Sequence, residues 1–154
     1  MTSILILTLI FTSLDQALKI IIDNHLMLGE SVRIIPNFFN ITIAHNTGAA
    51  WSILNNKSIF LILIGIIALI IVYFCFIKNK NLKKLDIILI SMLISGILGN
   101  LIDRIRLGYV IDYLDFNLFG YDYPIFNLAD ILIVLSIIIL VIKSIKEEKH
   151  VQSK

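Results

Sequence analysis

The chain has 154 residues, of which 58% are hydrophobic and only 16% charged, and its mean hydropathy is +0.96. A soluble domain of this length does not need so much apolar surface, so we expect lipid to be the solvent for most of the chain. The formal net charge of +2 comes from lysines in two short clusters beside apolar runs, which argues against a nucleic-acid partner, and the single cysteine, Cys75, excludes an intramolecular disulfide and a cysteine metal motif.

The first apolar run, residues 4–22, predicts a membrane-spanning helix. It does not read as a cleaved signal peptide, because charged residues interrupt it and no small-residue cleavage site follows. Four polar residues recur at i, i+4, i+7 and i+11 and form one stripe on a helix: Thr8, Thr12, Asp15 and Lys19. A polar stripe in a membrane favours contact with other helices over contact with lipid. Asp15 and Lys19 fit either an ion pair at the helix end or a functional role, and the pattern leaves both open.

Residues 23–57 are too polar to cross a membrane and predict a small strand-rich lobe outside it. The segments 32–35 and 38–44 are rich in β-branched and aromatic residues, and a Pro-Asn pair between them is typical of a turn. The lobe ends in the motif HNTGAAWSIL, residues 45–54, in which Gly48 would let the backbone approach another group closely.

Two further spans follow. Residues 58–77 contain no charge and predict a helix that serves as scaffold. Residues 86–105 predict a helix with a face of small residues for close packing, at Ser91, Ser95 and Gly99. A second line on the same helix turns polar toward its far end, at Gly96, Asn100 and Asp103.

The fourth span is expected at residues 125–143, because the apolar core of this run is too short to cross a bilayer of about 30 Å by itself. Asn127 suits the N-cap of this helix, and Asp130 then lies at the third helical position, where the helix dipole favours a carboxylate. Asp130 should therefore lie a few residues below the membrane surface.

The lysines predict the orientation. Residues 78–84 contain four lysines and residues 143–154 contain four more, so the positive-inside rule places both termini in the cytoplasm. We therefore expect residues 1–154 to form a single α-helical membrane domain with four transmembrane helices. A small β-rich extracytoplasmic lobe is expected between helices 1 and 2.

Asp112 and Asp130 are the candidate reactive groups, because both are expected where the chain meets the outer membrane face. Two carboxyl groups at one buried site cannot both ionise cheaply, so one would act as a base on water while the other donates a proton to a carbonyl group. The residues alone leave plainer interpretations open, a solvated loop acid for Asp112 and a capping acid for Asp130. Asp115 and Asp122 are interpreted as solvated loop acids.

Five motifs carry a resemblance to a known family, in the order DQALK (15–19), HNTGAAWSIL (45–54), GNLIDR (99–104), GYVIDY (108–113) and PIFNLAD (124–130). Together they resemble the lipoprotein signal peptidase family, signal peptidase II, over nearly the whole chain. Tyr113 and Trp51 stand where phenylalanine is commoner in the family. The resemblance implies a metal-independent aspartic endopeptidase of the bacterial cytoplasmic (inner) membrane, without a cofactor. Such an enzyme removes the signal peptide from diacylglyceryl-modified prolipoproteins by cutting before the lipidated cysteine.

The resemblance also assigns roles to residues. It makes Asp112 and Asp130 the catalytic pair. It implies substrate-binding or site-supporting roles for six residues: Asn46, Gly48, Asn100, Asp103, Arg104 and Asn127. Asp15 and Lys19 match a motif for which a structural role is expected. The implied partners are the prolipoprotein and membrane lipids but no nucleic acid, and the chain is expected to act as a monomer with its active site toward the outer face.

Three other interpretations compete with this one. A small transporter or channel subunit would bind a cation or relay protons with its acids, but would need them near mid-membrane. A metal-dependent hydrolase would use His45 with Asp112 and Asp130, although no HExxH-like spacing is present. A non-catalytic scaffold would leave the two buried acids unexplained.

Overall fold

The computed structural model describes residues 1–49, 53–78, 82–118 and 120–152, with side chains as far as residue 148. Its helices are α1 (Thr2–His25), α2 (Ser58–Val72) with its π-helical continuation η2 (Tyr73–Ile77), α3 (Lys84–Leu107) and α4 (Leu128–Gln152). Within the described ranges, four helical segments are long and apolar enough to cross a membrane: Thr2–His25, Ser58–Ile77, Lys84–Leu107 and Leu128–Glu148. The chain is a multi-pass membrane protein.

The expected spans can be compared with these helices. Residues 4–22, 58–77 and 86–105 are all helical, whereas the fourth helix begins at Leu128 and not at residue 125, because Asn127 caps it. Where the bilayer meets each helix stays a prediction.

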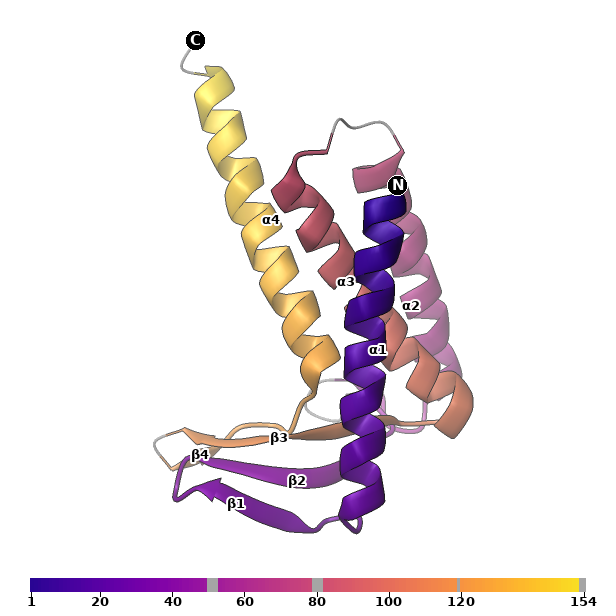
Figure 1. The fold of residues 1–154 in the computed structure, drawn as a ribbon, viewed down its shortest axis with the longest axis vertical. Helices are drawn as coiled ribbons and strands as arrows, with labels where there is room; N and C mark the ends of the chain where they lie inside the picture. The colour runs from indigo at the N-terminus through magenta and orange to yellow at the C-terminus, as the bar shows by residue number, and fades with distance from the viewer. Residues whose placement is uncertain (50–52, 79–81, 119, 153–154) are drawn as a thin grey trace.

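The helices run side by side, and a small sheet lies across one end of the bundle (Figure 1). The start of α1 and the far end of α4 lie at the opposite end, as do the end of η2 and the start of α3. The outward helix faces carry exposed apolar side chains such as Leu9, Ile59, Ile67 and Ile138. An apolar outer surface on a helical bundle is the surface that lipid would cover.

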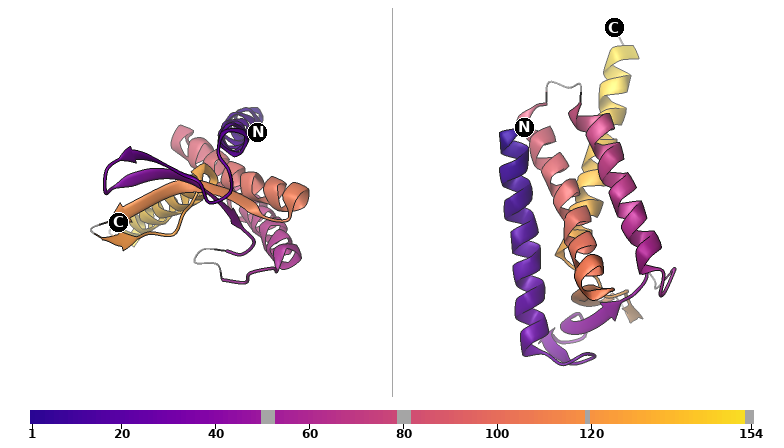
Figure 2. Two further views of the ribbon diagram at one scale, coloured as in Figure 1. Left: turned by 90° about the horizontal axis from the view of Figure 1, so that it is seen from below. Right: turned by 90° about the vertical axis from the view of Figure 1, so that its right-hand side faces the viewer.

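Helix α3 is the centre of the bundle and packs against α1, α2 and α4 (Figure 2). Its glycines permit close approach. A Cβ atom added at Gly96 would lie 2.5 Å from the carbonyl oxygen of Ala129 and 2.6 Å from Ile133 Cγ1. Gly96, from the second line expected on this helix, thus brings α4 against α3. Two residues of the expected small-residue face contact α1 instead: Ser91 Oγ donates to the Ile4 carbonyl, and a Cβ atom at Gly99 would collide with Asp15. An apolar cluster of Ile4, Val72, Ile90 and Leu93 joins α1, α2 and α3.

The sheet has four antiparallel strands in the order β1 (Ser31–Ile35), β2 (Phe39–Asn46), β3 (Val110–Leu118) and β4 (Tyr121–Asp122). Strands β1 and β2 form the expected lobe between α1 and α2. Strands β3 and β4 were expected to be loop, but β3 pairs with β2 along most of its length, with Ala44 opposite Asp112. Asp115, interpreted as a solvated loop acid, is half-buried on β3 and accepts a hydrogen bond from Thr42 Oγ1 at 2.6 Å.

The close approach at Gly96 generates a stability prediction. Gly96→Ala should lower the apparent melting temperature of the detergent-solubilised protein, because the new methyl group would collide with α4 backbone that cannot move freely. The expected cost is about 1–3 kcal/mol. Gly65→Ala on α2 is the matched control, since its Cβ would meet nothing nearer than Leu101 Cδ1 at 3.4 Å. Equal melting temperatures for the two variants would contradict the packing described for Gly96.

Candidate functional site

Asp112 lies on β3 at the sheet end of the bundle, and its side chain is buried. Pairing of β3 with β2 brings Asn46 beside it. Asn46 Nδ2 donates to Asp112 Oδ2 at 2.9 Å, and Asn127 Nδ2 donates to Asp112 Oδ1 at 2.6 Å. Both carboxyl oxygens of Asp112 therefore have an amide donor, which compensates part of the cost of burial.

Asp130 lies in the first turn of α4, as expected from the sequence, and forms a reciprocal cap with Asn127. The Asp130 N–H donates to Asn127 Oδ1 at 3.1 Å, and the Asn127 N–H donates to Asp130 Oδ2 at 3.2 Å. The other carboxyl oxygen of Asp130 accepts a hydrogen bond of 2.7 Å from Asn100 Nδ2 on α3. The helix cap thus holds Asp130 in one orientation.

Asn127 joins the two acids directly. Its amide oxygen binds the backbone of Asp130 while its amide nitrogen donates to Asp112. A second bond from the same nitrogen reaches Asn100 Oδ1 at 3.2 Å. Asp112 and Asp130, which are 18 positions apart in the chain, are therefore brought together around one buried amide.

The electrostatics of Asp112 suit proton transfer. Burial and then the negative charge of Asp130 raise the pKa of Asp112 from 3.8 to about 7, and the hydrogen bonds from Asn46 and Asn127 oppose this rise. A carboxyl group with a pKa near neutrality can both give and accept a proton at working pH. The arrangement can therefore support general acid–base chemistry by a carboxyl pair.

Arg104 connects the end of α3 to the turn after β2. Its Nη2 atom donates to the Gly48 carbonyl at 2.8 Å, and its positive charge interacts with both Asp112 and Asp130. Gly48 in turn donates its N–H to Asn46 Oδ1 at 2.9 Å. The backbone of Gly48 therefore approaches the site closely, as expected, whereas residues 50–52 of the same motif, Trp51 included, lie outside the described residues.

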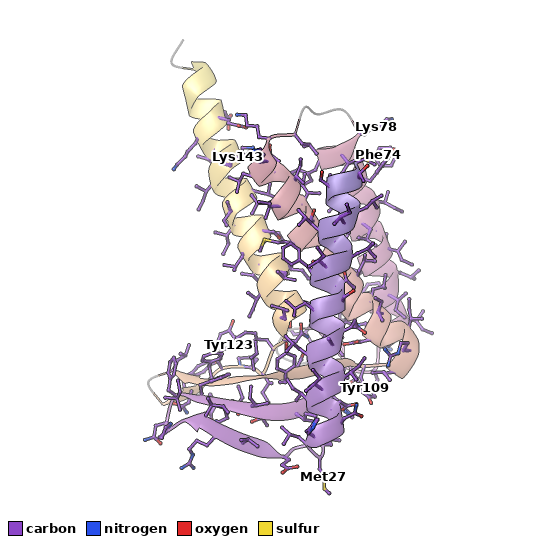
Figure 3. All side chains as sticks on the ribbon, in the orientation of Figure 1. Met27, Phe74, Lys78, Tyr109, Tyr123 and Lys143 are labelled. Carbon is purple, nitrogen blue, oxygen red and sulfur yellow. The ribbon has the colours of Figure 1, made fainter. Side chains whose placement is uncertain are left out.

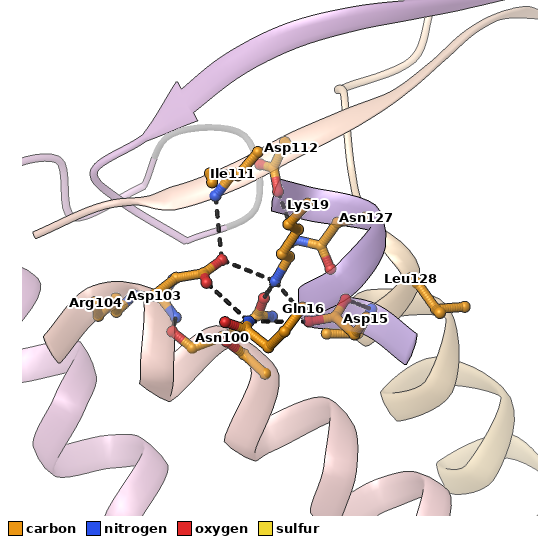
Figure 4. Close-up of polar contacts among 12 residues, drawn as sticks. Asp15, Gln16, Lys19, Asn100, Asp103, Arg104, Ile111, Asp112, Asn127 and Leu128 are labelled. Atoms are coloured by element: carbon orange, nitrogen blue, oxygen red, sulfur yellow. Dashed lines mark hydrogen bonds and ion pairs between the residues drawn. The ribbon is translucent and has the colours of Figure 1, made fainter. Parts of the chain in front are cut away.

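Asp15, Lys19 and Asp103 form a buried cluster where α1 meets α3 (Figure 4). Lys19 Nζ lies 3.0 Å from Asp15 Oδ2 and 2.8 Å from Asp103 Oδ2. Gln16 joins this cluster through a hydrogen bond of 2.9 Å to Asp103 Oδ1. Sequence analysis assigned it no role, although its place in the motif DQALK was an available signal.

Tyr113 is a second residue whose part the sequence did not predict. Its hydroxyl oxygen accepts a hydrogen bond of 3.3 Å from the Leu128 N–H, so it helps to cap α4. Burial raises the pKa of Tyr113, which keeps the phenol neutral. The sequence did contain one signal for this role. Tyr113 stands where the family more often has phenylalanine, which lacks the hydroxyl group.

His45 lies apart from this arrangement of hydrogen bonds. Its ring stacks on Tyr109 with a centroid distance of 3.9 Å, and its Nε2 atom is 3.6 Å from Asp23 Oδ1. Among the described residues, no three His, Cys, Asp or Glu side chains are grouped so that they could hold a metal ion. The interpretation as a metal-dependent hydrolase built on His45 therefore finds no ligand set in the part of the chain that the structure describes.

The raised pKa of Asp112 generates a prediction about stability. The folded protein binds this proton more tightly than the unfolded chain, so the wild type should lose stability as pH rises from about 4 to about 7. Asp112→Asn removes this titration. The melting temperature of the variant relative to wild type should therefore increase over the same range and level off above it. The effect should reach a few kcal/mol, at about 1.4 kcal/mol for each unit of pKa shift.

Asp122→Asn is the control for this measurement, because Asp122 is exposed on β4. The difference in melting temperature between Asp122→Asn and the wild type should stay constant from about pH 4 to about pH 7, whereas the difference for Asp112→Asn should change. A pH-independent difference between Asp112→Asn and the wild type would contradict the raised pKa.

Comparison with known proteins agrees with the resemblance in the five motifs. The family model described as signal peptidase (SPase) II matches residues 7–146. The lipoprotein signal peptidases of Staphylococcus aureus strains JH9 and Newman are each 42% identical to this chain over 153 residues, which cover 99% of this chain and 93% of each relative. Two solved structures of bacterial membrane enzymes are also similar. One has a TM-score of 0.89 at 39% identity, covering 97% of this chain and 92% of the other. The second has a TM-score of 0.84 at 40% identity, covering 95% and 94%. The chain therefore belongs to the signal peptidase II family.

Proposed function

We propose that this chain is a membrane aspartic endopeptidase that removes the signal peptide from diacylglyceryl-modified prolipoproteins, cutting before the lipidated cysteine, with Asp112 and Asp130 as its catalytic pair. Membership of the signal peptidase II family supports the reaction. The observation that carries the assignment of residues is the joining of the two carboxyl groups through the Asn127 cap, together with the raised pKa of Asp112.

The proposed chemistry divides the work between the two acids. Both carboxyl oxygens of Asp130 accept hydrogen bonds, from the cap and from Asn100, and we assign Asp130 as the base that takes a proton from the attacking water. Asp112, which holds its proton near neutral pH, donates it to the oxygen of the scissile carbonyl group. The water oxygen bonds to the carbonyl carbon and forms a tetrahedral diol. Asp130 then gives its newly gained proton to the leaving nitrogen, while the Asp112 carboxylate takes a proton from a hydroxyl group of the diol. The C–N bond breaks, a carboxylic acid and an amine form, and both acids return to their starting states.

Site support is proposed for the remaining polar residues. Asn46, Asn100 and Asn127 donate to the catalytic carboxyl groups, and Arg104 supplies a nearby positive charge. Gly48 fixes the Asn46 amide through its N–H. Asp103 supports the site indirectly through Lys19. Action as a monomer stays a prediction.

The depth of the site supports a lipid-anchored substrate. Asp112 and Asp130 lie where the helices meet the sheet, at one end of the apolar bundle (Figure 1). A substrate with its acyl chains in the membrane would present its scissile bond at this level. The same position argues against a transporter, whose acids should lie along a path through the middle of the membrane.

We further propose that the protein lies in the bacterial cytoplasmic membrane with its termini in the cytoplasm and its active site toward the outer face. Lys78 and Lys143 lie at the end of the bundle opposite the sheet, whereas Met27, Tyr109 and Tyr123 mark the sheet end (Figure 3). Basic residues favour the cytoplasmic side, and aromatic residues favour the membrane interface.

Replacement of either acid tests the function. Asp112→Asn and Asp130→Asn should each nearly abolish cleavage of a diacylglyceryl-modified prolipoprotein by purified protein in detergent, because each removes the shared proton while preserving side-chain size. The double variant should be hardly less active than either single variant, because groups that act as a unit are not additive. Gel-shift or mass-spectrometric detection of the released signal peptide provides the measurement.

Asp122→Asn should cut at close to the wild-type rate in the same assay. Wild-type cleavage by Asp112→Asn, with loss of cleavage in Asp115→Asn, would mean that the wrong acid has been assigned. Parallel reactions in excess EDTA should keep their activity, and loss that Zn²⁺ restores would favour a metal-dependent reaction instead.

Cysteine labelling tests the orientation. In a Cys75→Ser background, Asp122→Cys at the sheet end should react with a membrane-impermeant maleimide on intact cells without an outer membrane. Lys146→Cys on α4 should react only after the cells are permeabilised. Both positions are exposed, so access to the reagent alone separates them. The reverse pattern would place the acids on the cytoplasmic face and exclude the proposed substrate.

A further inference from the structure

Three asparagine amides donate to the two acids, and two of them are oriented by the main chain. Asn46 Oδ1 accepts the Gly48 N–H at 2.9 Å, and Asn127 Oδ1 accepts the Asp130 N–H at 3.1 Å. A backbone N–H can only donate, so each amide must present its oxygen to it and its nitrogen to Asp112.

Asn100 is the exception, because side chains and not the main chain orient its amide, and one of them is the charged Lys19. Its Oδ1 atom accepts hydrogen bonds of 3.2 Å from Lys19 Nζ and 3.2 Å from Asn127 Nδ2, while its Nδ2 atom donates to Asp130 at 2.7 Å. An ammonium group has three donors and no acceptor. A flipped Asn100 amide would place its NH₂ group against that ammonium and its oxygen against the Asp130 carboxylate.

Lys19 is itself held rigidly. Its side chain is 1% exposed, and Asp15 and Asp103 both contact its ammonium group. The same two acids accept backbone N–H groups next to the catalytic residues: Asp15 Oδ1 from Ala129 at 3.0 Å, and Asp103 Oδ2 from Ile111 at 3.3 Å (Figure 4). The cluster therefore contacts the residue that precedes each catalytic acid.

We propose that Lys19 is a positioning residue of the active site, which orients the Asn100 amide so that Asn100 donates to Asp130. The inference rests on the proposed function of Asp130. It goes beyond a structural role for Lys19, because it makes the rate of cleavage depend on one hydrogen bond between α1 and α3. The charged groups around the pair are Arg104 and Asp103 on α3 and Asp15 and Lys19 on α1. Burial and Asp130 raise the pKa of Asp112, and the charge of Lys19 opposes them.

The test uses Lys19→Met combined with Asp103→Asn, which removes one positive and one negative charge and so leaves the formal net charge of the Asp15–Lys19–Asp103 cluster unchanged. The full-length double variant in detergent should lose about 100-fold in kcat, as expected when a reacting group is misplaced. Its KM should stay within about threefold of the wild-type value, because buried Lys19 does not touch the substrate. In a plot of kcat against pH, the rise on the acidic side should move to higher pH. Wild-type kcat and an unmoved profile would overturn the proposal.

Lys19→Gln combined with Asp103→Asn is the conservative comparison. Glutamine is as neutral as methionine but keeps an N–H donor that can reach toward Asn100, so this variant should recover about tenfold of the lost kcat. Equal rates for the Gln and Met variants would show that the donor does not matter and would overturn the proposal.

Lys143→Met is the matched control for helix stability. Lys143 on α4 forms an ion pair with Asp86 on α3 at the opposite end of the bundle. This variant should lower the melting temperature while leaving kcat and its pH profile unchanged. A change in kcat like that of the Lys19 variant would mean that general loosening of the bundle explains both effects, and would overturn the proposal.

Asn100→Leu tests the same link without touching the ion pairs of Lys19, and so it decides the matter if the Lys19 variants do not fold. It should show a similar loss of kcat and the same direction of pH shift, and adding the Lys19 and Asp103 changes should cost little more. Wild-type cleavage by Asn100→Leu would overturn the proposed link.

The Asp112→Asn variant separates the failure of this inference from the failure of the proposed function. Full activity of the Asn100 or Lys19 variants beside an inactive Asp112→Asn would refute this inference alone. An active Asp112→Asn would refute the proposed function.

Discussion

The ammonium group of Lys19 is buried where α1 meets α3, and its three protons face three acceptors: the carboxylates of Asp15 and Asp103 and the amide oxygen of Asn100. A buried ammonium group without partners costs several kcal/mol, so α1 must dock on α3 in the register that supplies these acceptors. Gly99 makes the docking possible, because a Cβ atom there would collide with the Asp15 carboxylate. Charge compensation and close packing therefore select the same arrangement of the first and third helices.

The same cluster positions the elements that carry the acids. Asp15 accepts the Ala129 N–H at the start of α4, and Asp103 accepts the Ile111 N–H on β3. Two carboxylates thus compensate one ammonium group and also satisfy backbone donors that would otherwise lack partners at a helix start and a strand. The result is a shared support for Asp112 and Asp130, which the proposed proton transfer between oriented groups would require.

The helices and the α4 cap could be predicted from the sequence because they depend on neighbours within a few residues. The stripe containing Asp15 and Lys19 predicts a helix contact, and both side chains are indeed buried there. Strand β3 could not be predicted in this way. Its acids made it resemble a loop, and it becomes a strand by pairing with β2, which precedes it by about 70 positions.

In the candidate site too, features set by near neighbours could be predicted from the sequence, and contacts between distant segments could not. The spacing of the residues could not predict that Asp112 lies near Asp130, because their proximity depends on the register of β3 and on Asn127. The hydroxyl group of Tyr113 and the amide of Gln16 were missed because their partners lie far along the chain. The roles of the site residues came from the family resemblance, and they stay predictions.

The distribution of the buried charges along the chain has a consequence for biosynthesis. Asp15 and Lys19 lie one helical turn apart, so α1 can enter the membrane with its two charges already offsetting each other. Asn100 and Asp103 are added with α3, Asp112 follows with β3, and Asp130 is made only at the start of α4. A nascent chain that has not reached α4 contains one member of the acid pair and neither half of the Asn127–Asp130 cap. On the proposed assignment of Asp130, the peptidase can become active only after its last transmembrane helix has been made.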